Sequence, residues 1–278
     1  VMSVATSIVR QDTKAGRFYE VIVDAVTYLL PSVTHVLSAI AKPALVFWAA
    51  NRERTLGIET SADLYVDLFQ QLHATTTGGE ILSRTAYIAT LKRRLGQQKA
   101  HQRELETAGN IGSEAHALIE WTLRDMLGQA QGKAPVVSDP ARAAFVAFQS
   151  WASTVDLQPI FVEQTVYSLN HNYAGTMDVL AKVDGKLTLI DWKTSTRVYN
   201  EASLQNIAYQ QAMQEMGHPT ERGLIIRLPK TIQDKSFEVI DVPQWEASDL
   251  FPVFLAVKKL WDWWHPHQRK SPRKKQST

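Results

Sequence analysis

The chain has 278 residues, of which 45% are hydrophobic and 21% charged, and its formal net charge is +2. This composition is typical of a globular protein, and the length suits one large domain or two small ones. Cysteine is absent, which excludes disulfides, thiolate catalysis and cysteine-ligated iron–sulfur clusters, so a metal ion would need oxygen and imidazole ligands. No apolar run is long enough to span a membrane and no secretory signal is recognisable, so we expect an intracellular protein.

The first half of the chain reads as strands followed by helices. Strands are expected within residues 17–30, and Ser32 is expected to cap the helix that follows. Further helices are predicted over residues 44–53, 61–73, 79–105, 113–130 and 140–152. Gly109 and Gly112 are expected to interrupt the chain before the fourth of these helices.

The second half changes to strands that surround one helix. Strands are predicted over residues 158–168, 173–183, 186–194, 222–228 and 236–242, and helices over 201–217 and 247–264. The pattern indicates an α/β core that carries an N-terminal helical region. We divide the chain into an N-terminal part (1–135), a core (136–264) and a basic tail (265–278) that is expected to be disordered.

One predicted hairpin places two aspartates opposite each other. Asp184-Gly185 separates two β-rich runs and is a strong signal for a two-residue type I′ turn. With that turn, cross-strand partners have residue numbers that sum to 369, so Asp178 faces Asp191. Carboxylates at about 5 Å repel by roughly 3 kcal/mol at an effective dielectric of 20. Lys193 leaves the same face as Asp191, and the three groups suit a divalent cation and an activated water.

The hairpin also admits a plainer interpretation. Facing charges occur on solvated sheets, and a β-bulge could separate the pair. However, both faces of the hairpin are apolar, with Val179 and Ile190 on one side and Leu180 and Leu189 on the other. A covered sheet is therefore expected, in which an uncompensated acidic pair is costly.

Two further residues are candidate ligands. His116 lies at the edge of the apolar stripe that Ala115, Leu118, Ile119, Thr122 and Met126 form on the predicted 113–130 helix, so it could reach inward to a metal or remain a hydrogen-bonded surface histidine. Glu163, in the strand before the hairpin, could be a third carboxylate, a group that orients a ligand, or a surface residue.

Other polar residues point to nucleic acid, each with a structural alternative. Gln205 and Tyr209 share one face of a helix and could hold a phosphate or a base, or could simply pack. A basic run could follow a phosphate backbone or lie on a solvated helix. Its members are Lys92, Arg93, Arg94, Lys99 and Arg103.

The order of these motifs resembles the PD-(D/E)XK nuclease superfamily, in its RecB-like branch. The resemblance lies in His116, Gly175-Thr-Met-Asp178, Asp191-Trp-Lys193 and Gln205-Asn-Ile-Ala-Tyr209. In addition, Leu30 to Leu37 (LPSVTHVL) is similar to the start of phage-encoded members and of the mitochondrial genome maintenance exonuclease. Each motif is short, but their joint order and spacing are fairly specific.

The resemblance implies a restriction-endonuclease-like core, over 136–264, with a mixed central sheet flanked by helices. It implies that His116, Asp178, Asp191 and the Trp192 carbonyl bind Mg²⁺ or Mn²⁺. It further implies that Lys193 activates water, so that Asp178, Asp191 and Lys193 are catalytic. Glu163 would support the site, and Gln205 and Tyr209 would hold nucleic acid near the scissile phosphate. No iron–sulfur cluster is possible in a chain without cysteine.

We therefore expect a metal-dependent deoxyribonuclease, and more narrowly an exonuclease that prefers single strands. Its partners would be single-stranded DNA or duplex ends and a protein of DNA repair, replication or recombination, without contact to a membrane. The setting would be the cytoplasm of a bacterial or phage-infected cell, or an organelle. The alternative is a DNA-binding or assembly protein with an inactive nuclease fold, although a complete acid–acid–lysine set argues against it.

Overall fold

The computed structural model describes residues 5–40, 43–74, 83–97, 99–231, 233–234, 236–266 and 273–274. Its contacts divide the chain into two units, the larger made of residues 1–40 and 111–278 and the smaller of residues 41–110. The domain boundaries at residues 135 and 264 that the sequence suggests remain a prediction. Among the described residues, no helix combines the length and apolar character needed to cross a membrane.

The smaller unit consists of helices. It contains α2 (Pro43–Ala74), α3 (Arg84–Leu95) and the first residues of α4 (Ala100–Met126). Three expectations are wrong here, since the predicted 79–105 helix is also divided, into α3 and the first part of α4. The predicted 44–53 and 61–73 helices are one helix, and α4 runs through Gly109 and Gly112 without a break. A glycine inside a helix costs only about 1 kcal/mol relative to alanine, so a long helix tolerates it. The break in the chain comes earlier, at Gly96, whose φ of 72° ends α3.

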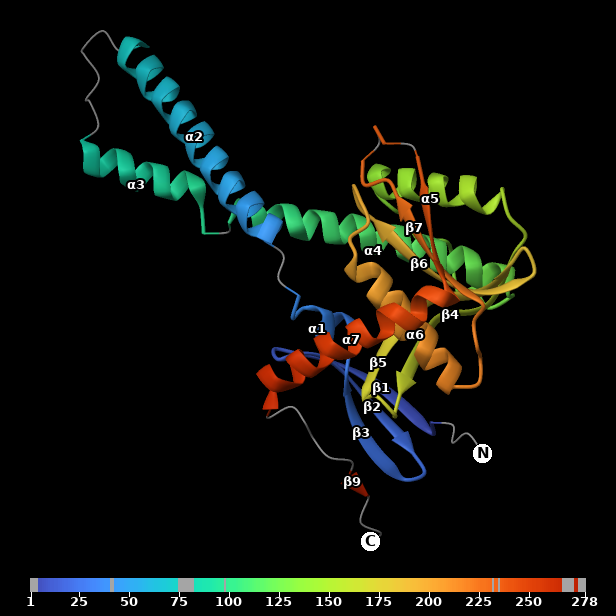
Figure 1. The fold of residues 1–278 in the computed structure, drawn as a ribbon. Helices are drawn as coiled ribbons and strands as arrows, with labels where there is room; N and C mark the ends of the chain where they lie inside the picture. The colour runs from blue at the N-terminus through green and yellow to red at the C-terminus, as the bar shows by residue number, and fades with distance from the viewer. Residues whose placement is uncertain are drawn as a thin grey trace. The chain divides into compact units, whose positions relative to one another are not determined.

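The larger unit is built on a mixed sheet of five strands (Figure 1). Its spatial order follows the chain: β4 (Leu157–Ser168), β5 (Tyr173–Val183), β6 (Lys186–Thr194), β7 (Arg222–Leu228) and β8 (Glu238–Pro243). Only β6 and β7 pair in parallel, because α6 (Glu201–Glu215) carries the chain back between them. The expected mixed central sheet flanked by helices is therefore confirmed.

Helices cover both faces of this sheet. On one face α4 and α5 (Asp139–Ala152) bury Val179 and Ile190 in what we call the α4–α5 core. On the other face α1 (Val33–Leu37), α6 and α7 (Gln244–Trp264) bury Leu180 and Leu189 in the α6–α7 core. The hairpin is thus apolar and covered on both sides, as its sequence indicates, and the Asp191 side chain, 1% exposed, lies in a low-dielectric environment.

A small antiparallel sheet precedes the main one. Its strands are β1 (Ser7–Thr13), β2 (Gly16–Val23), β3 (Val26–Pro31) and the two-residue β9 (Arg273–Lys274), which pairs with β3. Strand β1 has no counterpart among the predicted elements, because its residues lack a clear apolar alternation. Arg273 and Lys274 belong to the predicted disordered tail, most of which lies outside the described residues. Ser32 caps α1 as expected, with its Oγ accepting from the His35 N–H at 3.1 Å.

Candidate metal centre

The β5–β6 hairpin has the predicted turn and register. Asp184 and Gly185 both have positive φ, 51° and 79°, which is the requirement of a type I′ turn. The paired positions run from Val183–Lys186 to Val179–Ile190, so each pair sums to 369. The ladder ends at that last pair. The next positions are Asp178 and Asp191, and here the Trp192 N–H donates to Asp178 Oδ2 at 2.7 Å.

This hydrogen bond has two consequences for the centre. It fixes the Asp178 carboxylate at the point where the two strands part. Because the N–H and C=O of one strand residue point to the same side, the Trp192 carbonyl is directed toward the same strand as its N–H. The carbonyl of Trp192 therefore faces β5 near Asp178, which is compatible with the ligand role that the sequence suggests.

At Glu163 in β4 and Asp178 in β5, each strand turns over, so that side chains before and after this point lie on opposite faces of the sheet from those that strict alternation predicts. Met177 and Leu180 both pack in the α6–α7 core although they are an odd number of residues apart, and Val179 packs in the α4–α5 core. Their partners on β4 behave alike, with Val162 in the α4–α5 core and Val166 in the α6–α7 core. Strict alternation would keep each set on one face, so both strands turn over between them.

The turnover point is strained. Glu163 has a φ of 51°, in the left-handed region that a long side chain rarely occupies, and the register places it opposite Asp178. Strain of this kind persists only where the surrounding structure enforces it, and it gathers at functional sites. Here it brings two carboxylates on adjacent strands to the edge of the α4 helix.

His116 completes a group that could hold a metal ion. Its ring, from α4, lies with Nδ1 3.8 Å from Asp178 Oδ1. One potential ligand atom from each of His116, Glu163 and Asp178 lies within 4.8 Å of the other two, and all three side chains are partly buried. Among the described residues this is the one group of three that meets this condition. One imidazole and two carboxylates suit a hard divalent ion.

Asp191 lies beside this group but is held by other partners. It is 1% exposed, and its Oδ2 is 2.5 Å from Lys193 Nζ. Gln205 from α6 joins both residues: its Nε2 donates to Asp191 Oδ1 at 3.0 Å and its Oε1 accepts from Lys193 at 3.2 Å. The ammonium group is therefore held in one place by two anchors from different elements.

Burial and charge shift the pKa values of the acids and the lysine. Burial, with the charges of Asp178 and Glu120, raises the pKa of Glu163 to about 8. Burial also raises the pKa of Asp191, against the opposing charge of Lys193. For Lys193, burial alone would lower the pKa, but the charges of Asp191 and Asp178 outweigh it and raise the value. An excess of buried negative charge is what a bound cation would neutralise.

The position of Tyr209 favours the packing alternative that its sequence allows. It is 3% exposed and lies against Gly175, where an added Cβ would come within 2.4 Å of its Cε1. Its hydroxyl is 3.5 Å from Gln205 Nε2, at the limit of a hydrogen bond. The glycine of the GxxD motif thus makes room for the tyrosine of the QxxxY motif, and the ring packs beside the glutamine that holds Asp191 and Lys193.

The other predicted residues fall into two places. Asp178, Asp191, Lys193, Gln205 and His116 come together in the larger unit, and Glu163 belongs to the same group as His116. The predicted basic run lies in the smaller unit, where its side chains are exposed and Arg94 pairs with Asp67 at 2.7 Å. On α4, Ala115, Leu118 and Ile119 are buried as expected, but Met126 is 54% exposed and Leu123 is buried instead.

The model of one protein family matches most of this region. The description of that family is the PD-(D/E)XK nuclease superfamily, and the match covers residues 80–269. It includes the hairpin, His116, Glu163, Gln205 and Tyr209. The chain belongs to this superfamily, whose nucleases use divalent metals, and the resemblance read from the motifs is confirmed at this level.

Comparison with other proteins adds two distant structural likenesses. A protein from Eubacterium rectale, titled as a candidate exonuclease, is 11% identical, with 71% of this chain and 79% of that chain covered at a TM-score of 0.35. A protein named SSO0001 is 14% identical, with 58% and 76% covered at a TM-score of 0.26. A search of curated proteins found no match.

Proposed function

We propose that this protein hydrolyses phosphodiester bonds of DNA with the help of a divalent metal ion, Mg²⁺ or Mn²⁺, as an exonuclease that prefers single strands. The observation that supports it most is the group of His116, Glu163 and Asp178 next to the Asp191–Lys193 pair. Family membership supports nuclease chemistry. The preference for ends and for single strands follows from the motif resemblance alone.

The residues divide into ion ligands and groups that act on the substrate. His116, Asp178 and Asp191, with the Trp192 carbonyl, would hold the ion, and the position of Glu163 beside His116 and Asp178 supports a role as a further ligand. The bound ion would lower the pKa of a water molecule and neutralise charge on the phosphate. Lys193 would orient the attacking water and stabilise negative charge as it develops, while Gln205 keeps the ammonium group in place.

The first experiment compares wild type with Asp178→Asn and Lys193→Ala on end-labelled linear DNA and on circular DNA, single- and double-stranded, in Mg²⁺ and in EDTA. We expect degradation of linear single strands in Mg²⁺ only. Both substitutions should lower kcat by at least about a hundredfold, since each removes a group that the transition state needs.

A binding measurement separates the two roles. Isothermal titration with Mn²⁺ should show weaker binding for Asp178→Asn and nearly unchanged binding for Lys193→Ala. Loss of metal binding in the lysine variant would contradict the division of roles. Wild-type protein that binds DNA without cleaving any of the substrates would instead support the inactive-nuclease alternative.

A further inference from the structure

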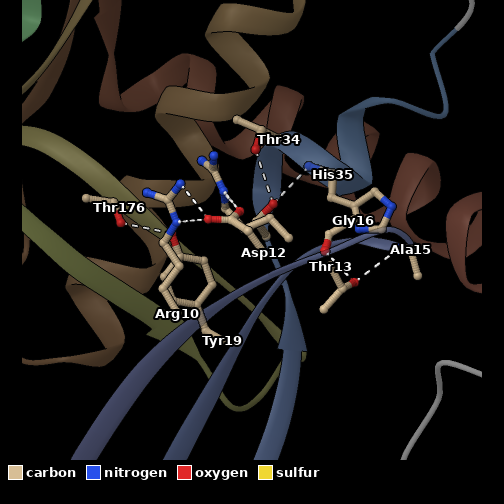
Figure 2. A network of polar contacts seen from close by, with 11 residues as sticks. Arg10, Asp12, Thr13, Ala15, Gly16, Tyr19, Thr34, His35 and Thr176 are labelled. Atoms are coloured by element: carbon tan, nitrogen blue, oxygen red, sulfur yellow. Dashed lines mark hydrogen bonds and ion pairs between the residues drawn. The ribbon is translucent and has the colours of Figure 1, made fainter. Parts of the chain in front are cut away.

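One face of the β1–β2 hairpin is turned toward the main sheet. The register pairs Arg10 with Tyr19 and Asp12 with Arg17, so these four side chains leave the hairpin on the same side. Tyr19 is 1% exposed, and its hydroxyl lies 2.9 Å from Thr176 Oγ1 on β5. Figure 2 shows Arg10 beside Tyr19 and Thr176, with Asp12 next to it.

On this face, the carboxylate of Asp12 lies between the guanidinium groups of Arg10 and Arg17. Arg10 and Arg17 each lie 2.8 Å from one oxygen of Asp12. The side chains are 47%, 39% and 56% exposed for Arg10, Arg17 and Asp12, so the pairs contribute little to stability. Together the three side chains carry a net charge of +1. The two guanidinium groups, which donate to a carboxylate here, can also donate hydrogen bonds to the oxygens of a phosphate.

This arginine pair lies next to the metal centre. Thr176, which holds Tyr19, is paired with Thr165 on β4, and Asp178 and Glu163 follow two residues away on the same two strands. The distance along a strand for two residues is about 7 Å. The charge of Arg10 also acts on the Glu163 carboxyl, where it opposes the rise of the pKa that burial causes.

We propose that Arg10 and Arg17 bind a backbone phosphate of the nucleic acid next to the metal centre, and that Asp12 holds this position in the substrate-free protein. The inference rests on the proposed function for the identity of the substrate. An incoming phosphate would displace Asp12 or share the two guanidinium groups with it. Asp12 therefore competes with the substrate, and the two arginines contribute binding rather than chemistry.

If Asp12 competes with the phosphate, substitutions of Arg10 and of Asp12 should change the affinity for DNA in opposite directions. A loss of folding would instead weaken binding in both variants. Arg10→Ala should weaken the affinity for a fluorescein-labelled single-stranded DNA oligonucleotide by about tenfold, measured by anisotropy in EDTA. The slope of the logarithm of the binding constant against the logarithm of the salt concentration should become less steep by about one, which corresponds to the loss of one phosphate contact. Asp12→Asn should tighten binding several-fold, because it removes a competing anion. Arg142→Ala, an exposed arginine on α5, is the control for charge and should change affinity less than about twofold.

Steady-state kinetics in Mg²⁺ complete the test. Arg10→Ala should raise KM with kcat within about twofold of wild type, since a remote phosphate contact is made equally in the ground and transition states. The inference is overturned if Arg10→Ala and Arg142→Ala behave alike, or if Asp12→Asn binds DNA more weakly than wild type. If wild type binds DNA but does not cleave it, the proposed function fails. The affinities of the variants then still show whether Arg10 and Arg17 bind a phosphate. Wild type that neither binds nor cleaves DNA overturns both.

Discussion

Glu163 combines a strained backbone with a carboxyl group that resists ionisation. Its left-handed φ costs on the order of 1–3 kcal/mol, and its charge is opposed by burial and by Asp178. Neither feature stabilises the ion-free protein. Both become reasonable if a cation binds between Glu163, Asp178 and His116, because the cation favours the ionised form of each acid.

The raised pKa makes ion-free stability depend on pH. The pKa of Glu163 is 4.5 for the ordinary group and about 8 in the fold, so the folded state binds the proton more tightly than the unfolded state. Its contribution to stability is present below pH 4.5 and is lost as the pH rises through 8. In EDTA at pH 9, Glu163→Gln should therefore be more stable than wild type, by on the order of 2–5 kcal/mol, and near equal at pH 4. Urea melts at both pH values measure this, and a gain that is the same at both would contradict it.

Helix α6 is fixed to the sheet by a buried polar network rather than by apolar contacts alone. Asn206 is fully buried and donates to the carbonyl oxygens of Leu189 and Leu224, at 3.4 and 3.3 Å. Gln210 donates to Asn206 and accepts from Thr220. Since Gln205 precedes Asn206 on this helix, the network also sets the position of the group that holds Asp191 and Lys193.

The network depends on a glycine in β7. A Cβ at Gly223 would lie 1.8 Å from Asn206 Oδ1, so Gly223→Ala must displace Asn206 and leave buried polar groups unpaired. We expect a loss of roughly 2–4 kcal/mol in the free energy of unfolding. Gly109→Ala is the control, because that glycine lies inside α4 with nothing within 4 Å of its added Cβ. It should gain about 0.5–1 kcal/mol. Chemical denaturation compares the two, and equal effects would contradict the prediction.

Short-range signals predict the elements around the centre well. Asp184-Gly185 requires positive φ at both positions, which sets the register of the β5–β6 hairpin as far as the Val179–Ile190 pair. The cap at Ser32 follows from local chemistry in the same way. These features depend on residues that are neighbours in sequence, so a single sequence is enough to find them.

Features that depend on tertiary contacts could not be predicted. The turnover of β4 and β5 at Glu163 has no local signature, since glutamate is not a residue that favours a left-handed backbone. For this reason the sequence leaves Glu163 open between a third carboxylate, a group that orients a ligand, and a surface residue. Gly109 and Gly112 suggest a break, but α4 continues through both. Arg10, one of the two arginines, lies on β1, a strand without a periodic pattern.

At the scale of the whole molecule, ion binding and folding should be linked. The proposed ligand atoms come from α4, β4 and β5, elements distant in sequence that are brought together only in the folded state. A ligand that binds the folded state alone stabilises it by about 2.7 kcal/mol at a hundred times its Kd.

Saturating Mn²⁺ should therefore raise the Tm of wild type by roughly 5–10 °C relative to EDTA. Asp178→Asn should remove most of this shift, because it takes away one of the charges that attract the ion. Differential scanning calorimetry at neutral pH measures both. An equal shift in the variant would mean that the ion acts elsewhere on the protein.

The contact between Gly175 and the Tyr209 ring makes two short motifs depend on each other. A larger residue at position 175 requires a smaller one at position 209, and the reverse exchange opens a void in the core. Homologues should thus change at these two places together or at neither. A single substitution at one of them should be rescued by a compensating substitution at the other, so the pair would evolve as one unit although the motifs are read separately.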